Sequence, residues 1–310
     1  MESAADAEDL RVALGYSQWN LYGGSYGTRL GLEILRYRPE TIRSAVLDSV
    51  YPPQENFHTG VFATFSRSLG ALGVACDAQP SCVAAYPDLP GTFADLVARL
   101  NAAPVQLPIV NLETGVTIDY LPLTGVDLTI IVFQLLYVTS AIPVMPALIG
   151  QSARGDYTIV SRLTSALITQ DLPGDVPLIS QGMQVAVQCN EDATFAHARE
   201  FVAARDSHRP VAALAYSPLF NEAILDICAS WGLKATSPAQ NKAVTSAVPS
   251  LLIGGELDPI TPPSNAREAA GTLSRATVVI YPHGGHAPSV GSPCLVSVIA
   301  IKPTDLNGHT

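Results

Sequence analysis

A serine flanked by glycines stands near the start of the chain and is well suited to act as a nucleophile. Ser25 lies at the centre of a G-x-S-x-G pattern, Gly23-Gly24-Ser25-Tyr26-Gly27. Small neighbours let a serine occupy strained backbone in a tight turn between a strand and a helix, where its hydroxyl is exposed. The spacing therefore predicts a nucleophile elbow and acyl-transfer chemistry.

Two later segments supply the acid and the base that a serine nucleophile needs. Asp258 follows the apolar run 248–253, and His286 lies in a glycine-rich loop after the apolar run 276–281. We expect His286 to take the hydroxyl proton of Ser25, while Asp258 holds the imidazole tautomer and stabilises its positive form. The order Ser, Asp, His is the order of the catalytic triad in α/β-hydrolases.

Each of these residues has a rival. Asp48 also follows a strand-like run and is the alternative acid, and His283 is the alternative histidine. Asp258 is preferred because the acid usually follows the penultimate strand in this chain order. His286 is preferred because two glycines free the backbone before it. A lone G-x-S-x-G pattern also occurs by chance, so the three residues carry the prediction together.

Three segments of the chain must position these side chains. Residues 1–53 and 248–310 alternate short apolar strands with helices, which is typical of a parallel sheet covered on both faces. Residues 54–247 lack strong strand signals and contain amphipathic helical stretches such as 91–100 and 126–138. We therefore predict an α/β fold in which a large, mainly helical cap, residues 54–247, is inserted into the sheet domain.

Composition excludes several classes of protein. The chain has 310 residues, 48% of them hydrophobic and 14% charged, with a formal net charge of -10. These values are typical of a packed globular protein, and the negative charge without a basic run argues against nucleic acid as a partner. The most apolar stretch, 128–138, is too short to span a bilayer, and the residues at the N-terminus of this chain do not have the pattern expected of an export signal. No metal-ligand spacing is present, so we expect no metal and no cofactor.

The five cysteines bear on the cellular compartment. Cys76 and Cys82 bracket a short loop whose Pro and Ser favour a compact turn that a disulfide could close. Cys189 and Cys228 could form a second bridge, which leaves Cys294 alone. Spacing is weak evidence of connectivity, and the alternative is five buried thiols that pack as small hydrophobes. If the disulfides form, the parent protein works outside the reducing cytosol.

The segments around the serine and the acid resemble a known family. Residues 21–29 and 255–262 are similar to the tripeptidyl aminopeptidase and proline iminopeptidase group of α/β-hydrolases, and the resemblance extends to 76–89 and 188–192. It implies a secreted serine hydrolase that removes residues from peptide N-termini or cleaves simple carboxylic esters. It also implies these roles: Ser25 as nucleophile, Asp258 as acid, His286 as base and the Tyr26 backbone N–H as one oxyanion donor.

Within the cap, the resemblance implies that a carboxylate holds a substrate's free α-amino group. Glu191 and Asp192 are the candidates, and Gly24 beside the nucleophile is a further candidate substrate contact. The alternative for the two carboxylates is a solvated acidic loop. Phe133 and Tyr137 are candidates to line an acyl pocket, although aromatic residues at helical spacing more often belong to a core.

The chain departs from the family ahead of Ser25. Family members carry several strands before the elbow, including a glycine-rich loop that supplies a second oxyanion N–H, and we expect this chain to lack them. Loss of one oxyanion donor typically lowers kcat by about 10²–10³-fold. An apolar strand at 19–22 without a neighbour on one side invites pairing. We therefore expect a homo-oligomer through this edge, or an edge rebuilt from cap segments.

Two functions follow from these patterns. The first is a serine hydrolase acting on short acyl esters or on peptide N-termini, which the complete triad supports. The second is a truncated, non-catalytic hydrolase-like fragment that binds a ligand or a partner chain, which the missing oxyanion loop supports. Because ester leaving groups need less protonation than amines, a weakened oxyanion hole favours esters. Short-chain carboxylesterase activity is therefore expected.

Overall fold

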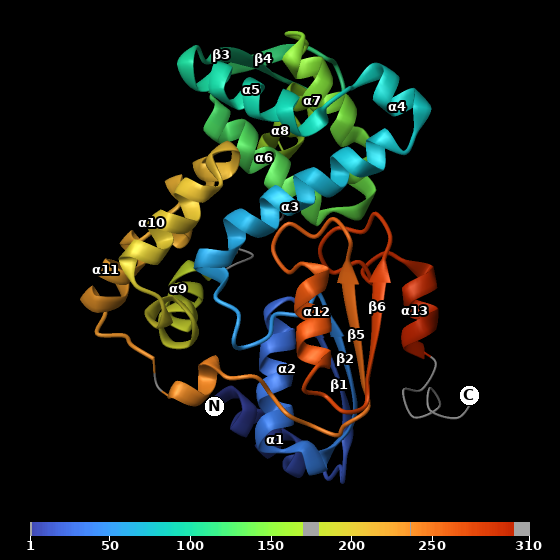
Figure 1. Ribbon diagram of the computed structural model, residues 1–310, viewed down its shortest axis with the longest axis vertical. Coiled ribbons are helices and arrows are strands. Elements are labelled where there is room, and N and C mark those ends of the chain that lie inside the picture. Colours follow the sequence, from blue (N-terminus) through green and yellow to red (C-terminus); the bar gives the residue numbers. More distant parts are fainter. Residues whose placement is uncertain (1, 170–179, 236, 301–310) are drawn as a thin grey trace.

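The computed structural model describes residues 2–169, 180–235 and 237–300 and shows a flanked sheet with a helical cap beside and above it (Figure 1). Residues 301–310 of the second predicted core segment lie outside the described residues. The helices and strands are, in chain order, α1 (Glu2–Ala13), β1 (Trp19–Gly24), α2 (Tyr26–Tyr37), β2 (Ile42–Asp48), α3 (Phe57–Asp77), α4 (Pro80–Ala85), α5 (Leu89–Ala102), β3 (Val105–Val110), β4 (Thr117–Leu123), α6 (Gly125–Tyr137), α7 (Met145–Ala153), α8 (Thr158–Thr169), α9 (Gln181–Glu191), α10 (Ala198–Ser207), α11 (Ala223–Ser230), β5 (Ser250–Gly255), α12 (Pro263–Ala270), β6 (Ala276–Tyr281) and α13 (Pro293–Ala300).

Four strands form the main sheet in the order β1-β2-β5-β6, and every adjacent pair is parallel. The carboxyl ends of the strands are aligned: Gly24 pairs with Asp48, and Asp48 pairs with Ile253. Every residue of β5 is buried, as expected for a central strand of a sheet covered on both faces. The predicted α/β fold with a parallel sheet is therefore confirmed.

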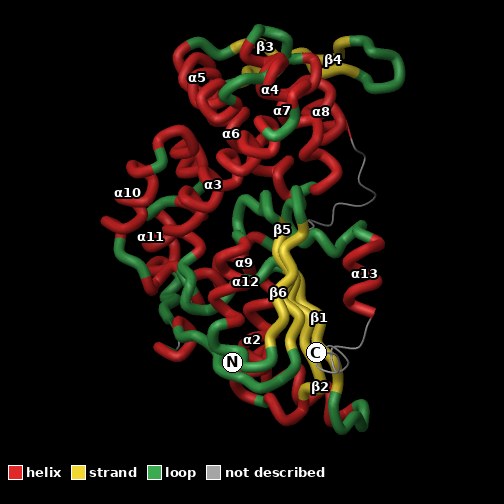
Figure 2. Tube along the Cα trace, turned by 45° about the vertical axis from the view of Figure 1, so that its right-hand side comes forward, coloured by secondary structure: helices red, strands yellow, loops and turns green. Residues whose placement is uncertain are grey.

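Helices cover both faces of this sheet (Figure 2). On one face, α1, α2 and α12 pack against the strands through buried residues such as Leu32 and Ala266. On the other face, Leu295 of α13 packs against Val46 and Leu251. Burial on both faces explains why the central strand β5 has no alternation of polar and apolar residues, whereas the outer strand β1 alternates partly buried and exposed positions.

The cap has a hydrophobic core of its own. Phe62 and Phe65 of α3, Phe93 of α5 and Phe133 of α6 belong to one buried cluster. The rings of Phe65 and Phe133 meet edge to face with their centroids 5.2 Å apart. Helix α6, which holds most of the most apolar stretch of the sequence, contributes to this core. In the part of the chain that the structure describes, no helix is long and apolar enough to cross a membrane.

A hairpin lies within residues 54–247, the segment that the sequence predicts to be mainly helical and that shows no strong strand signal. Strands β3 and β4 pair antiparallel, and the Asn111 side chain accepts two backbone N–H groups of the turn between them. Gly115, at a φ of 71°, completes the turn. Pro108 and Pro122 obscured the strand pattern. Proline is tolerated here because both strands are edges of a two-stranded sheet.

Strand β1 is an edge of the main sheet. Among the described residues no other strand pairs with its free side, so the expectation that cap segments rebuild this edge is wrong. Trp19 and Leu21 are partly buried against the core beneath α2, whereas the Tyr22 residue is 56% exposed. Self-association through this edge stays a prediction.

Two disulfides link helices of the cap. Cys76 and Cys82 join the end of α3 to α4, and Cys189 and Cys228 join α9 to α11. Cys294, on α13, is an exposed free thiol. The second disulfide holds the helix whose C-terminal end carries the two candidate carboxylates.

Candidate active site

Ser25 lies in the turn between β1 and α2, in backbone that few residues other than glycine adopt. Its φ and ψ are 54° and -123°. Such backbone costs about 1–3 kcal/mol and clusters at functional sites. A Cβ on Gly23 would lie 2.4 Å from the carbonyl oxygen of Gly27, so the first glycine of the pattern is required where strand and helix approach each other. The Ser25 N–H donates to the Asp48 carbonyl at 2.9 Å, which ties the turn to β2.

Helix α2 begins directly after the serine, at Tyr26. The first N–H groups of an α-helix have no partner within the helix, and they form the positive end of its dipole. The Tyr26 N–H therefore lies where negative charge on a substrate oxygen bound to Ser25 would be stabilised. The oxyanion role of Tyr26 rests on this position and stays a prediction.

Asp258 and His286 come from two neighbouring loops beyond the carboxyl ends of β5 and β6, and they meet directly. Nδ1 of His286 donates to Oδ2 of Asp258 at 2.8 Å. The Asp258 side chain is fully buried, and that of His286 is 10% exposed. Because Nδ1 donates to the carboxylate, the imidazole lone pair lies on Nε2, the nitrogen that a general base needs.

The two loops pack backbone against backbone. A Cβ on Gly255 would lie 1.8 Å from the carbonyl oxygen of Gly285, so this contact requires glycine. The Gly285 N–H donates to the hydroxyl of Thr139 at 3.0 Å, and the His286 N–H donates to the carbonyl of Tyr137 at 3.1 Å. The glycines before His286 thus serve close approach to the cap and to β5, a reason different from the free backbone that the sequence suggested.

The Asp258 carboxylate is surrounded by hydrogen-bond donors. Oδ1 accepts the N–H groups of Ile260 and Thr261, both at 2.9 Å, and Oδ2 accepts the hydroxyls of Thr261 at 2.7 Å and Ser49 at 2.8 Å. Burial raises the pKa of this carboxyl, but the electrostatic interaction with His286 and the hydrogen bonds from His286 and Thr261 outweigh burial and hold the pKa below its usual range. Asp258 is therefore ionised and can stabilise an imidazolium.

Sequence reasoning missed both hydroxyls that hold this carboxylate. Thr261 stands three residues after Asp258, a spacing at which an aspartate caps the following turn, so a local signal was available. Ser49 carries no such signal. It reaches Asp258 only because β2 and β5 are neighbours in the sheet.

Ser25 and His286 follow β1 and β6, the two outer strands, and both lie at the carboxyl end of the parallel sheet, where a short series of contacts connects them. The Ser25 N–H binds the carbonyl of Asp48, and the hydroxyl of the adjoining Ser49 accepts the N–H of Ala287, next to His286. In the described part of the chain, the Ser25 hydroxyl itself makes no hydrogen bond to His286. Such bonds are often long in free enzymes and tighten when substrate binds.

The two rivals lie elsewhere. Asp48 is fully buried, and its Oδ2 accepts the N–H of Ser289 at 3.0 Å as well as the Ser289 hydroxyl. Burial raises the pKa of the Asp48 carboxyl, and the hydrogen bonds from Ser289 only partly offset this. His283 has a side chain that is 64% exposed and lies 3.7 Å from Glu256. Neither rival takes part in the Asp258–His286 contact.

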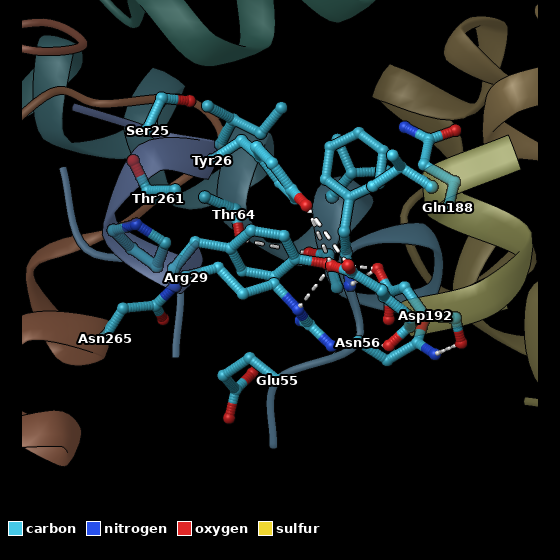
Figure 3. A pocket seen from close by; sticks show the side chains of 18 of the residues that line it. Ser25, Tyr26, Arg29, Glu55, Asn56, Thr64, Gln188, Asp192, Thr261 and Asn265 are labelled. Atoms are coloured by element: carbon cyan, nitrogen blue, oxygen red, sulfur yellow. Dashed lines mark hydrogen bonds and ion pairs between the residues drawn. The ribbon is translucent and has the colours of Figure 1, made fainter. Parts of the chain in front are cut away.

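A cavity of 660 Å³ lies beside Ser25, between the sheet domain and the cap. Figure 3 shows Ser25 and Thr261 on one side of it and Gln188 and Asp192 of the cap on the other. Cavities of about 300–1,000 Å³ are typical of small-molecule sites. Many of its lining side chains are apolar or aromatic, among them Phe57, Val61, Tyr137, Met183, Val187 and Ile260. Within the described ranges, no group of His, Cys, Asp and Glu side chains could hold a metal ion.

The two aromatic candidates of α6 differ in position. Tyr137 lines the cavity, and its ring centroid lies 4.8 Å from that of His286. Phe133 belongs to the cap core and is not among the residues that line the cavity. Tyr137 therefore joins the histidine loop to the cavity wall, whereas Phe133 has the core position that is more frequent at this spacing.

Glu191 lines the cavity but is already paired. Its two carboxylate oxygens accept the Tyr26 hydroxyl at 3.1 and 3.2 Å, and Nε of Arg29 lies 3.5 Å from Oε2. Burial raises the pKa of the Glu191 carboxyl, while the positive Arg29 and the Tyr26 hydroxyl lower it. Arg29 is 2% exposed, so its charge compensates that of Glu191 inside the protein.

Asp192 also lines the cavity, and its carboxylate is hydrogen-bonded at the junction of the cap and the sheet domain. Its carboxylate accepts the Tyr51 hydroxyl and, at 3.0 Å, the N–H of Phe57. Only 4% of Asp192 is exposed, which excludes the solvated acidic loop for this residue. Gly24 is not among the residues that line the cavity.

Comparison with known sequences identifies the C-terminal region. Residues 213–301, a range that contains Asp258 and His286, match the family described as TAP-like protein. The proline iminopeptidases of two Xylella fastidiosa strains are each 43% identical to this chain over 47 residues, which is 15% of this chain and 15% of each relative. The aligned part thus spans far less than two thirds of the relatives' length.

Solved structures are similar only at low identity. A serine hydrolase of the bacterium Cycloclasticus zankles is 11% identical, with 99% of this chain and 71% of that chain covered and a TM-score of 0.36. The proline iminopeptidase of Mycobacterium smegmatis is 15% identical, with 97% and 70% covered and a TM-score of 0.36. TM-scores this low transfer neither a residue role nor a substrate to this chain.

Proposed function

We propose that this α/β-hydrolase, whose C-terminal region is TAP-like, is a serine carboxylesterase that cleaves short acyl esters through an acyl-enzyme on Ser25. The contact between Asp258 and His286 carries the proposal, because it leaves Nε2 of the imidazole free to act as a base at the carboxyl end of the parallel sheet, the end at which the strained Ser25 turn also lies. The predominantly apolar lining of the adjacent cavity supports an uncharged acyl group as the substrate part that binds there.

The proposed reaction uses the residues in the following way. The Ser25 hydroxyl oxygen attacks the ester carbonyl carbon while Nε2 of His286 takes its proton, and Asp258 stabilises the imidazolium through Nδ1. The Tyr26 N–H stabilises the oxyanion of the tetrahedral intermediate. His286 then donates the proton to the leaving alcohol. Water, activated by the same imidazole, attacks the acyl-enzyme and releases the acid and free Ser25.

The state of the two cap carboxylates favours esters over peptide N-termini. An α-amino group is held well by a carboxylate whose charge is not already compensated. Glu191 faces Arg29 and Tyr26, and Asp192 is buried against Tyr51 and the N–H of Phe57. Both groups therefore serve the junction between cap and sheet domain. Aminopeptidase activity, which the family resemblance implies, remains the alternative substrate preference.

Active-site labelling tests the proposal. We expect a fluorophosphonate to label the wild type at Ser25 and not Ser25→Ala, because attack requires the hydroxyl activated by His286. The wild type should hydrolyse p-nitrophenyl butyrate and not an aminoacyl p-nitroanilide. Absence of a Ser25 adduct in protein that is folded by circular dichroism would contradict the proposal and favour a non-catalytic, ligand-binding role. Turnover of the anilide at a rate comparable with the ester would instead identify an aminopeptidase.

The two disulfides support a localisation of the protein outside the reducing cytosol. Cys76–Cys82 and Cys189–Cys228 are both in the cap, and disulfides persist mainly in oxidising compartments. We infer that the parent protein is extracytoplasmic.

A further inference from the structure

We propose that Ser49 is a positioning residue that holds the side chains of Asp258 and His286 in their relative positions, an inference that rests on the proposed hydrolase function. Ser49 directly follows β2 and has no exposed surface. It does not line the cavity beside Ser25, so it does not touch substrate there. Its side chain instead lies between the loop of the acid and the loop of the base.

The hydroxyl of Ser49 joins these two loops. It donates to Oδ2 of Asp258 at 2.8 Å and accepts the N–H of Ala287, the residue after His286, at 2.7 Å. Because an N–H group can only donate, this contact uses a lone pair of the hydroxyl oxygen. The single hydroxyl hydrogen is thereby directed at the carboxylate. One atom thus sets the position of both loops.

The backbone of Ser49 indicates that the side chain is needed. Its φ is 59°, in the left-handed region where glycine is the least strained residue. A serine in this conformation costs free energy relative to glycine, and such outliers persist where the surroundings require them. The hydroxyl, which glycine would lack, is the group that both loops use.

The sheet determines where this hydroxyl lies. The Ser49 N–H donates to the carbonyl of Ile253 at 2.8 Å and so extends the pairing of β2 with β5 by one residue. Ser49 is therefore attached to the rigid part of the fold, whereas Asp258 and His286 are on loops. Without the Ser49 hydroxyl, the Asp258 carboxylate keeps its hydrogen bonds from Ile260 and Thr261, so its charge is still stabilised by donors. What the protein loses without the hydroxyl is the group that connects the loop of Asp258 to the loop of His286.

The test compares Ser49→Gly and Ser49→Cys with the wild type. Ser49→Gly relieves the backbone strain and removes the hydroxyl, and we expect kcat for p-nitrophenyl butyrate to fall about 10- to 100-fold, part of what positioned acid–base catalysis supplies. KM should stay within about twofold, because ground-state binding is untouched. Ser49→Cys has a larger side-chain atom than serine but keeps a weak donor and a weak acceptor, so its kcat should lie between those of Ser49→Gly and the wild type.

The second measurement is independent of turnover. The experiment follows the NMR signal of the Nδ1 proton of His286, which is hydrogen-bonded to Asp258. The signal is assigned by its loss in the variant His286→Gln. We expect this signal to broaden or disappear in Ser49→Gly as the contact loosens. Ser289→Ala is the matched control, since Ser289 is also buried and its hydroxyl holds the other buried carboxylate, Asp48. It should keep both the signal and the wild-type kcat.

The outcomes separate this inference from the hydrolase proposal. Wild-type kcat together with an unchanged Nδ1 signal in folded Ser49→Gly would overturn the positioning role. Equal losses in Ser49→Gly and Ser289→Ala would also overturn it, because they would indicate a general effect of removing a buried serine. If the wild type neither hydrolyses ester or anilide nor forms a Ser25 adduct, the hydrolase proposal fails, and the NMR comparison by itself decides whether Ser49 positions the pair.

Discussion

Two buried carboxylates lie at the ends of neighbouring strands and have opposite surroundings. Asp258, beyond β5, faces the imidazole of His286 and several donors, which lower its pKa. Asp48, at the end of β2, is held by Ser289, and its buried Oδ1 has no hydrogen-bond partner among the residues that the structure describes. Burial raises the pKa of the Asp48 carboxyl. A carboxylate that orients and stabilises an imidazolium must be ionised and must touch it. Only Asp258 meets both conditions.

Exchange of each carboxylate for an amide tests this difference. We expect Asp258→Asn to lower kcat by about 10⁴-fold, because the amide favours the wrong imidazole tautomer. Asp48→Asn keeps an oxygen that can accept from Ser289 and should retain kcat close to the wild type. Steady-state kinetics with p-nitrophenyl butyrate measure both. A larger loss in Asp48→Asn than in Asp258→Asn would reverse the assignment of the acid.

At the scale of elements, the turn around Ser25 depends on the close approach of the end of β1 to the start of α2. Gly23 at the end of β1 lies against Gly27 at the start of α2, and a side chain on Gly23 has no space there. The neighbouring Gly24 is different, because a Cβ on it would meet no atom within 4 Å. The two glycines therefore form a matched pair for substitution.

We expect Gly23→Ala to lower the free energy of unfolding by at least about 1–3 kcal/mol, since its Cβ would overlap backbone that cannot move without opening the turn. Gly24→Ala should unfold at the same urea concentration as the wild type. Equilibrium urea denaturation followed by circular dichroism measures both variants. Equal stability of the two would show that the turn tolerates a side chain at Gly23. A raised KM in Gly24→Ala, with stability unchanged, would support the predicted substrate contact of that residue.

At the scale of the whole molecule, several half-buried or buried carboxyls have raised pKa values and make folding depend on pH. Glu55, on the wall of the cavity, is the clearest: burial and the nearby Glu268 raise its pKa from an ordinary 4.5 to about 7. Between these two values the folded protein keeps a proton that the unfolded chain has released. Its contribution to stability is therefore fully present below pH 4.5 and is lost as pH rises through 7.

The variant Glu55→Gln cannot lose this proton. We expect the difference between the melting temperature of Glu55→Gln and that of the wild type to shift in favour of Glu55→Gln as pH rises from 4.5 to 7, the interval between the two pKa values. Glu113→Gln, a change at an exposed carboxylate of the hairpin turn, is the control and should follow the wild type. Thermal unfolding at a series of pH values gives the comparison. A constant difference between Glu55→Gln and the wild type across this range would contradict the raised pKa.

The sequence by itself determined the features whose causes are local or carried by a strand pattern. The turn around Ser25 is specified by five adjacent residues because the steric conflict that glycine relieves lies within them. The apolar runs predicted the parallel sheet because strands buried on both faces need no polar alternation. The loops of Asp258 and His286 follow from the positions at which two of these runs end.

Tertiary structure alone decided which polar groups meet. Asp258 rather than Asp48 contacts His286, and Glu191 is paired with Arg29, which is 162 residues away in sequence. Ser49 reaches the acid across 209 residues, through the pairing of β2 with β5. Side-chain hydrogen bonds act over about 3 Å, so partners distant in sequence become neighbours only after the sheet and the cap have packed. For this reason the sequence predicted a candidate nucleophile, acid and base, and the tertiary structure decided which side chains each carboxylate contacts.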